Sequence, residues 1–122
     1  MGNCYFLSAL SAIAEFPKRI ADLFLTKEAN KAGCYAMRFI VNGEYKEVIV
    51  DDYFPYDPKL KGPAFSRAKG NELWVLLLEK AWAKLNGNYE NTISGLVHDA
   101  LAFLLPAPCE FLDHNYEEDI WP

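Results

Sequence analysis

Long apolar runs, basic runs and cysteine pairs are all scarce in this 122-residue sequence. No uninterrupted apolar run is longer than the one at residues 73–78, whereas a membrane-spanning helix needs about 20 apolar residues. The sequence contains no run of Lys or Arg and its net charge is −5, which argues against a nucleic-acid partner. The first helix has no basic segment ahead of it, so we expect neither a signal peptide nor an integral membrane segment.

Cysteine is represented by only three residues, Cys4, Cys34 and Cys109. The number is odd, the spacing is wide and no Cys-x-x-Cys pair occurs, so a disulfide framework is not indicated. Reduced thiols of this kind are typical of proteins in a reducing compartment. We therefore expect a cytoplasmic location.

Apolar and aromatic residues are plentiful, at 52% and 15% of the chain. This composition excludes intrinsic disorder. A chain of this length buries roughly two-thirds of its unfolded surface, which is enough for a single core. We see no repeat, low-complexity stretch or domain boundary, and we expect one unit.

Two helices and a hairpin are predicted in the first half of the chain. Residues 4–15 place apolar side chains at three- and four-residue spacing, and small residues fill the other face, which is typical of a buried central helix. Residues 18–25 form an amphipathic pattern. Residues 34–41 and 45–50 are rich in β-branched and aromatic residues and are separated by Asn-Gly at 42–43, which predicts an antiparallel hairpin.

The second half is predicted to be mainly helical. Residues 72–85 carry a wide apolar stripe, with Asn71 as the expected N-cap, and residues 94–104 form a shorter helix that ends before Pro106. The long connection at residues 56–70 is expected to carry function. Helices, then a hairpin, then helices again indicate an α+β fold with a small antiparallel sheet.

Cys4 is the strongest candidate for chemistry, because it stands where a polar turn runs into an apolar helix. The free N–H groups and the positive dipole end at a helix N-terminus favour a thiolate over a thiol. The alternative is that Cys4 is an inert residue that only packs in the core, as most free cysteines do.

Three sequence blocks carry a resemblance to a known family. They read GNCYFLSALS at residues 2–11, VDDYFP at residues 50–55 and NELWVLLLEKAWAKLNGNYE at residues 71–90. In this order and at this spacing they resemble the calpain family of papain-like cysteine proteases, and the likeness is clearest over residues 2–95. Asn3 stands where the family commonly has Asp, and Tyr5 where it commonly has Trp.

The resemblance implies that residues 1–122 form the N-terminal lobe of a calpain-type protease core, which is an incomplete catalytic domain. It implies an endopeptidase acting on protein or peptide substrates, with Cys4 as the nucleophile. The family's catalytic His and Asn come from a second lobe, which would be the partner of this one. The family's second oxyanion donor is a glutamine six residues upstream of the cysteine, a position outside this sequence. We therefore expect this chain to be inactive alone.

The resemblance also assigns Glu72 as a ligand of Ca²⁺. From its position alone, Glu72 is a first-turn helix residue favoured by the macrodipole. Ca²⁺ takes six to eight oxygen ligands, and the family's other ligands lie in a loop ahead of the cysteine. We therefore expect Ca²⁺ binding by the complete core and weak or no binding by this chain.

The other polar residues are assigned structural roles. His98 and His114 lack the Gly-His-Ala context of the family's histidine, so neither is expected to be the catalytic base. Asp51 and Asp52 point to opposite faces of a strand, and one of them is expected to cap a turn. Cys109, Asp113 and His114 match no zinc-binding pattern, and we expect no metal there.

Two other classes of function stay open at this point. The chain is a calpain-like module that binds proteins without catalysis, or a helical domain with a purely structural role, because fold does not determine function. If it is a protease lobe, the surface that lines the cleft between lobes is exposed, and the isolated lobe is expected to self-associate.

Overall fold

The computed structural model describes residues 3–28, 30–63 and 73–109. Two helices come first, then the antiparallel strands, then the remaining helices, as the α+β prediction requires. The elements in chain order are α1 (Cys4–Ala14), α2 (Pro17–Leu23), β1 (Cys34–Val41), β2 (Glu44–Asp51), β3 (Tyr56–Asp57), β4 (Gly62–Pro63), α3 (Trp74–Leu85), the 3₁₀ turn η1 (Glu90–Thr92) and α4 (Val97–Leu104). None of these helices has the length and apolar character needed to cross a membrane.

The hairpin of β1 and β2 is confirmed in type and position. Val41 pairs with Glu44 across a two-residue turn in which Asn42 and Gly43 have φ angles of 52° and 79°. Positive φ at both central residues is the conformation that Asn-Gly accepts most readily. The ladder continues to Cys34 and Asp51, so β2 is one residue longer at each end than the sequence predicts.

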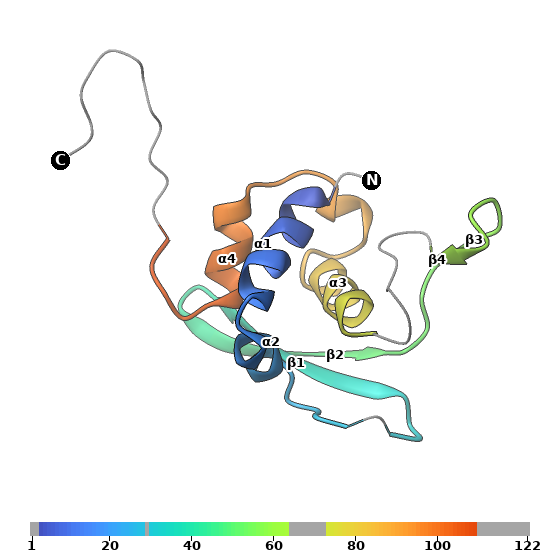
Figure 1. Cartoon of the computed structure of the whole chain (residues 1–122), viewed down its shortest axis with the longest axis horizontal. Helices are drawn as coiled ribbons and strands as arrows, with labels where there is room; N and C mark the ends of the chain where they lie inside the picture. Colours follow the sequence, from blue (N-terminus) through green and yellow to red (C-terminus); the bar gives the residue numbers. More distant parts are fainter. Residues whose placement is uncertain (1–2, 29, 64–72, 110–122) are drawn as a thin grey trace, which may run out of the picture.

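Three helices lie over the hairpin, with α1 between α3 and α4 (Figure 1). Helix α1 packs against α4 and α2, while α3 packs mainly on β2 and α4 on β1. The short β3–β4 ribbon extends away from this body beyond the end of β2 (Figure 1). The predicted buried central helix is therefore α1.

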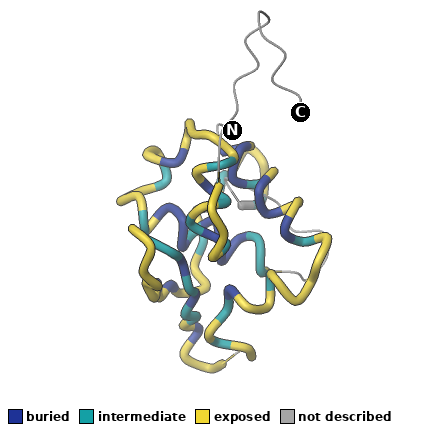
Figure 2. Tube along the Cα trace, turned by 90° about the vertical axis from the view of Figure 1, so that its left-hand side faces the viewer, coloured by how far each residue is buried: buried dark blue, intermediate teal, exposed yellow. Residues whose placement is uncertain are grey.

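Trp82 of α3 joins the core together. Its ring stacks on Phe6 of α1 at a centroid distance of 4.9 Å, and it meets Phe103 of α4 edge-on at 5.2 Å. Phe39 of β1 lies 6.2 Å away on the sheet side. Three other elements thus contact this one ring, and the buried positions gather on the inward sides of the trace (Figure 2). The fully buried large side chains are Phe6, Leu10, Ile13, Met37, Phe39 and Leu78.

The start of α1 and the ends of α3 and α4 are where the sequence predicts them, the other helix boundaries differ by one to three residues, and some predicted positions lie outside the described residues. Helix α3 begins at Trp74 with Leu73 as its N-cap, and the expected N-cap Asn71 is not among the described residues. Helix α4 begins at Val97, three residues later than predicted, because its N-cap Leu96 is extended. The predicted connection at residues 56–70 contains the ribbon of β3 and β4 in its described part.

Candidate active site

Cys4 is the first residue of α1, and its side chain is exposed. The helix begins there because the Asn3 carbonyl accepts hydrogen bonds from the N–H groups of Phe6, at 3.1 Å, and Leu7, at 3.2 Å. The N–H of Cys4 itself, as the first of the helix, has no intrahelical acceptor. A thiol and an unsatisfied N–H therefore stand together at the positive end of the helix dipole.

Asn3 anchors this end of α1 to α3. Its side chain is 3% exposed and makes no capping bond to α1, although Asn is a favoured N-cap residue. Instead, its Nδ2 donates to Oε1 of Glu79 at 2.5 Å. Glu79 is 2% exposed, in the middle of α3. The residue before Cys4 is thus bonded across the helix interface to a buried carboxyl group.

Tyr5 follows Cys4 and is held on two sides. Its hydroxyl accepts a hydrogen bond from Nε1 of Trp82 at 3.1 Å. Gly95 approaches the ring so closely that a Cβ at this position would lie 2.7 Å from two ring carbons. The residues on both sides of Cys4 are therefore buried and bonded, while Cys4 itself faces outward.

The exposed side of α1 continues from Cys4 along the helix. Ser8, Ser11 and Glu15 are exposed and lie at the helical spacing that puts them on the same side as Cys4. We call Cys4, Ser8, Ser11 and Glu15 the thiol face of α1. Its first three members are small, so a partner surface can approach the helix backbone closely along this face.

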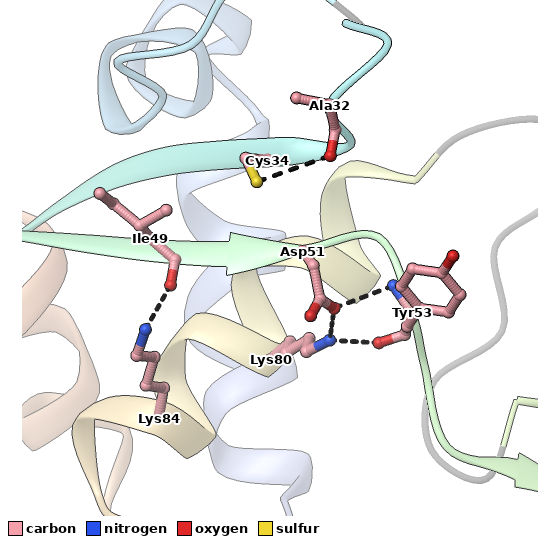
Figure 3. A network of polar contacts seen from close by, with 7 residues as sticks. All are labelled: Ala32, Cys34, Ile49, Asp51, Tyr53, Lys80 and Lys84. Atoms are coloured by element: carbon pink, nitrogen blue, oxygen red, sulfur yellow. Dashed lines mark hydrogen bonds and ion pairs between the residues drawn. The ribbon is translucent and has the colours of Figure 1, made fainter.

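Lysine side chains tie α3 to the end of β2. Nζ of Lys80 donates both to Oδ1 of Asp51 and to the carbonyl of Tyr53, and Nζ of Lys84 donates to the carbonyl of Ile49 at 2.6 Å (Figure 3). Asp51 also accepts the N–H of Tyr53 at 3.0 Å, which is the turn-capping role expected for one of the two aspartates. The hydrogen bond from Lys80 lowers the pKa of Asp51 below its usual value.

Tyr89 lies just after α3, where the charges of Glu79 and Asp51 both act on its phenol. Burial raises its pKa to about 12, and the charges of Glu79 and Asp51 add to the effect. The phenol therefore keeps its proton at physiological pH.

The described structure does not test Glu72, the other site residue predicted from the sequence. Glu72, His114 and Asp113 lie outside the described residues. Within the described ranges, no three His, Cys, Asp or Glu side chains gather as a metal site. His98 lies on α4 with Nε2 at 3.4 Å from Oδ1 of Asp99, and Cys109 is exposed with its thiol directed at the Ala107 carbonyl.

Comparison with known protein families assigns this chain to one of them. The model of the calpain family of cysteine proteases matches residues 1–122, the whole chain. The chain belongs to the calpain family. The resemblance carried by the three sequence blocks is thereby confirmed, and the α+β architecture agrees with this family assignment.

Curated relatives agree with this assignment. The calpain-type cysteine protease ADL1 of rice is 46% identical over 114 residues, which is 93% of this chain and 5% of that protein. The calpain-type cysteine protease DEK1 of maize gives the same identity and coverage. The human calpain-2 catalytic subunit is 37% identical over 99 residues, 78% of this chain and 14% of that subunit. The chain thus spans a small part of each relative's length.

The sequence reasoning missed Asn3 and Glu79 as a pair. A signal was present, because Glu79 follows Leu76 by three residues and precedes Trp82 by three, and so lies on the apolar side of its helix. A charged residue at such a position requires a buried partner. Its partner lies 76 positions away in the sequence, and only the fold identifies it as Asn3.

Proposed function

We propose that this chain is the nucleophile-bearing lobe of a calcium-dependent cysteine endopeptidase, with Cys4 as the nucleophile. The thiolate of Cys4 attacks the scissile peptide carbonyl, the amine leaves with a proton, and a thioester forms. Water then hydrolyses the thioester, which releases the acyl half of the substrate as a carboxylic acid and returns the thiolate. The assignment rests on family membership. It is a proposal because the chain covers only a small part of each relative, whose whole-protein activity does not pass to it directly.

The observation that carries the proposal is the exposed thiol of Cys4 at the first residue of α1, between two buried and anchored neighbours. An activated thiol must be accessible and close to positive potential, and the start of a helix supplies both. The N–H of Cys4 is also suited to donate to the oxyanion that develops during attack. A cysteine that only packs in a core would instead be buried.

The base and its orienting group are proposed to come from a second lobe that carries a His and an Asn. The thiol face of α1 supports this, since Ser8, Ser11 and Glu15 leave the helix open on the same side as Cys4. An unassembled lobe exposes this face and is proposed to self-associate. In the absence of the second lobe, Cys4 lacks the nucleophile–base pair of a working site, and the chain is proposed to be inactive alone.

Calcium dependence and a cytoplasmic location are further parts of the proposal. The described residues offer no acidic cluster for Ca²⁺, and Glu72 lies outside them, so no step of the reaction is assigned to the ion. Ca²⁺ requires several oxygen ligands, and Glu72 supplies one residue of such a set. The three cysteines are free thiols, which is in keeping with a reducing compartment.

The decisive experiment joins this chain to the second lobe of a calpain relative and measures cleavage of a peptide substrate with and without Ca²⁺. We expect cleavage by the assembled protein and none by the chain alone. Cys4→Ala should abolish the activity, whereas Cys34→Ala, which removes an exposed thiol from the start of β1, should leave it unchanged. An assembled protein that binds peptide without cleaving it would instead identify a non-catalytic binding module.

A further inference from the structure

Glu79 is a buried carboxyl group on a side of α3 whose other buried residues are apolar or aromatic. Its neighbours along the inward side of α3 are Leu76, Leu78 and Trp82, all of them buried. Removing a carboxylate from water is unfavourable unless hydrogen bonds replace the lost hydration. An apolar residue of similar size would pack here without that penalty, so the carboxyl group serves something other than packing.

Asn3 shows what that function is. As the N-cap of α1, an Asn side chain would ordinarily accept a hydrogen bond from an N–H of the first turn. Here, the amide turns away from α1 and donates its Nδ2 to Glu79 at 2.5 Å. The other end of the amide, Oδ1, is buried and finds no hydrogen-bond partner among the described residues. The bond to Glu79 therefore fixes the orientation of the Asn3 amide.

The backbone of Asn3 carries this constraint to Cys4. The Asn3 carbonyl accepts the N–H groups of Phe6 and Leu7, so its position sets the first turn of α1. Cys4 is the next residue, and its exposed thiol makes neither a disulfide nor a hydrogen bond in the described part of the chain, so its position follows that of its backbone. Movement of Asn3 would consequently displace the thiol and the free N–H together.

We propose that Glu79 is a positioning residue for the Cys4 thiol, acting through Asn3 across the interface between α1 and α3. The proposal rests on the proposed role of Cys4 as nucleophile. It assigns to the carboxyl group the task of holding the first turn of α1 in the conformation that presents the thiol. Asn3 suits this task because its amide N–H donates directly to the carboxyl group of Glu79. A carboxyl group in place of the Asn3 amide would have to share a proton with Glu79, because two like charges at this distance repel each other.

The test measures alkylation of the folded 122-residue chain by iodoacetamide at pH 7, with Cys34 as an internal reference thiol. Mass spectrometry of the digested protein gives the ratio of the Cys4 rate to the Cys34 rate. We expect Glu79→Leu to lower this ratio roughly two- to fivefold, the factor that corresponds to loss of a helix-terminus interaction. Glu79→Gln, which keeps an acceptor for Nδ2 of Asn3, should restore the ratio.

Leu78→Ala is the matched control, because Leu78 is the fully buried neighbour of Glu79 on the same helix. It destabilises the chain without removing the bond to Asn3, so it should leave the ratio unchanged while the unfolding midpoint falls. If Leu78→Ala lowers the ratio as much as Glu79→Leu does, the effect is one of general stability and the proposal is wrong. An unchanged ratio in Glu79→Leu would overturn it as well.

Should Glu79→Leu fail to fold, Asn3→Ala tests the same connection from its other end and is expected to lower the ratio similarly. An unchanged ratio in Asn3→Ala contradicts the proposal. This test of Glu79 can be told apart from the test of the proposed function, because it depends only on how the alkylation ratio changes between variants. Whether Cys4→Ala abolishes cleavage in the assembled protein is decided by the other experiment.

Discussion

Helix α3 is attached to the rest of the molecule along two sides that differ in chemistry. Toward α1 it presents Trp82 and Glu79, which are 4% and 2% exposed and meet aromatic rings and the Asn3 amide. Toward β2 it extends Lys80 and Lys84, whose amino groups bond the strand at the molecular surface (Figure 3). We call these the buried side and the lysine side of α3.

The difference teaches where the geometry of the candidate site is determined. Contacts on the buried side exclude water, so each lost group leaves a cavity or an unpaired polar atom. Contacts on the lysine side compete with water, and their net contributions are small. Cys4 is connected to the buried side, so its position should respond to changes there and hardly at all to changes on the lysine side.

The largest effect is expected from Trp82→Ala. The ring contacts α1, α4 and β1, and its loss should reduce the free energy of unfolding by about 3–5 kcal/mol. Chemical denaturation followed by circular dichroism measures this change. Trp82→Phe keeps most of the packing but loses the hydrogen bond to Tyr5, and it should cost less. A Trp82→Ala chain as stable as the wild type would contradict the comparison at its strongest point.

Gly95→Ala tests how tightly the buried side is packed around Tyr5. The added Cβ would lie 2.7 Å from the ring, and the ring cannot yield freely because its hydroxyl is bonded to Trp82. Overpacking of this kind should cost about 1–3 kcal/mol in unfolding free energy.

Gly62→Ala is the matched control for Gly95→Ala, because its Cβ would meet only the Leu60 carbonyl at 3.9 Å. We expect no loss of stability in this variant, measured in the same denaturation experiment. Equal losses in the two variants would show that glycine content, rather than contact with Tyr5, determines the result.

Lys84→Met tests the lysine side and should have a smaller effect. It removes the hydrogen bond to the Ile49 carbonyl and keeps a side chain of similar length, so the expected loss is about 1 kcal/mol or less. Lys46→Met, at an exposed position on β2, is the control for removing a positive charge. A loss as large as that of Trp82→Ala would remove the distinction between the two sides.

The sequence was sufficient to predict the parts of the fold that depend on local pattern. The Asn42-Gly43 turn and the start of α1 at Cys4 follow from backbone preferences and apolar spacing, and both are confirmed. The late start of α4 was not predicted, since the periodicity extends to residue 94. Gly95 lies against the Tyr5 ring instead of joining the helix, and this contact depends on the packing of α1.

The connections of α3 were beyond prediction for a similar reason. The sequence shows that Lys80 and Lys84 lie one turn apart on their helix. Their acceptors are one aspartate and two backbone carbonyls. Every strand offers backbone carbonyls, so the sequence does not show which strand the lysines bond. Cys4 was identified as a candidate because its signal is local, at a helix start within a family motif. Asn3 and Glu79 required the fold, because the bond between them joins residues far apart in the sequence.

The smallest effect is expected from the charge of Asp51, and it depends on pH. The hydrogen bond from Lys80 lowers the pKa of Asp51 in the folded chain below its unfolded value. The ionised carboxylate therefore contributes stability above the unfolded pKa of about 4, and this contribution is lost as the pH falls through the folded pKa. Asp51→Asn should thus be less stable than the wild type at pH 7, with the difference shrinking below about pH 4.

Asn is a suitable replacement because its side-chain oxygen still accepts the N–H of Tyr53, so the variant removes the charge and keeps the turn. Denaturation midpoints of both proteins at pH 7 and at pH 3 measure the difference. Added salt should reduce it at pH 7, since the ion pair is at the surface. If the difference in midpoint between the wild type and Asp51→Asn stays unchanged in acid, Asp51 acts through hydrogen bonding alone. The stability that the lysine side contributes would then come from its bonds to backbone carbonyls rather than from charge.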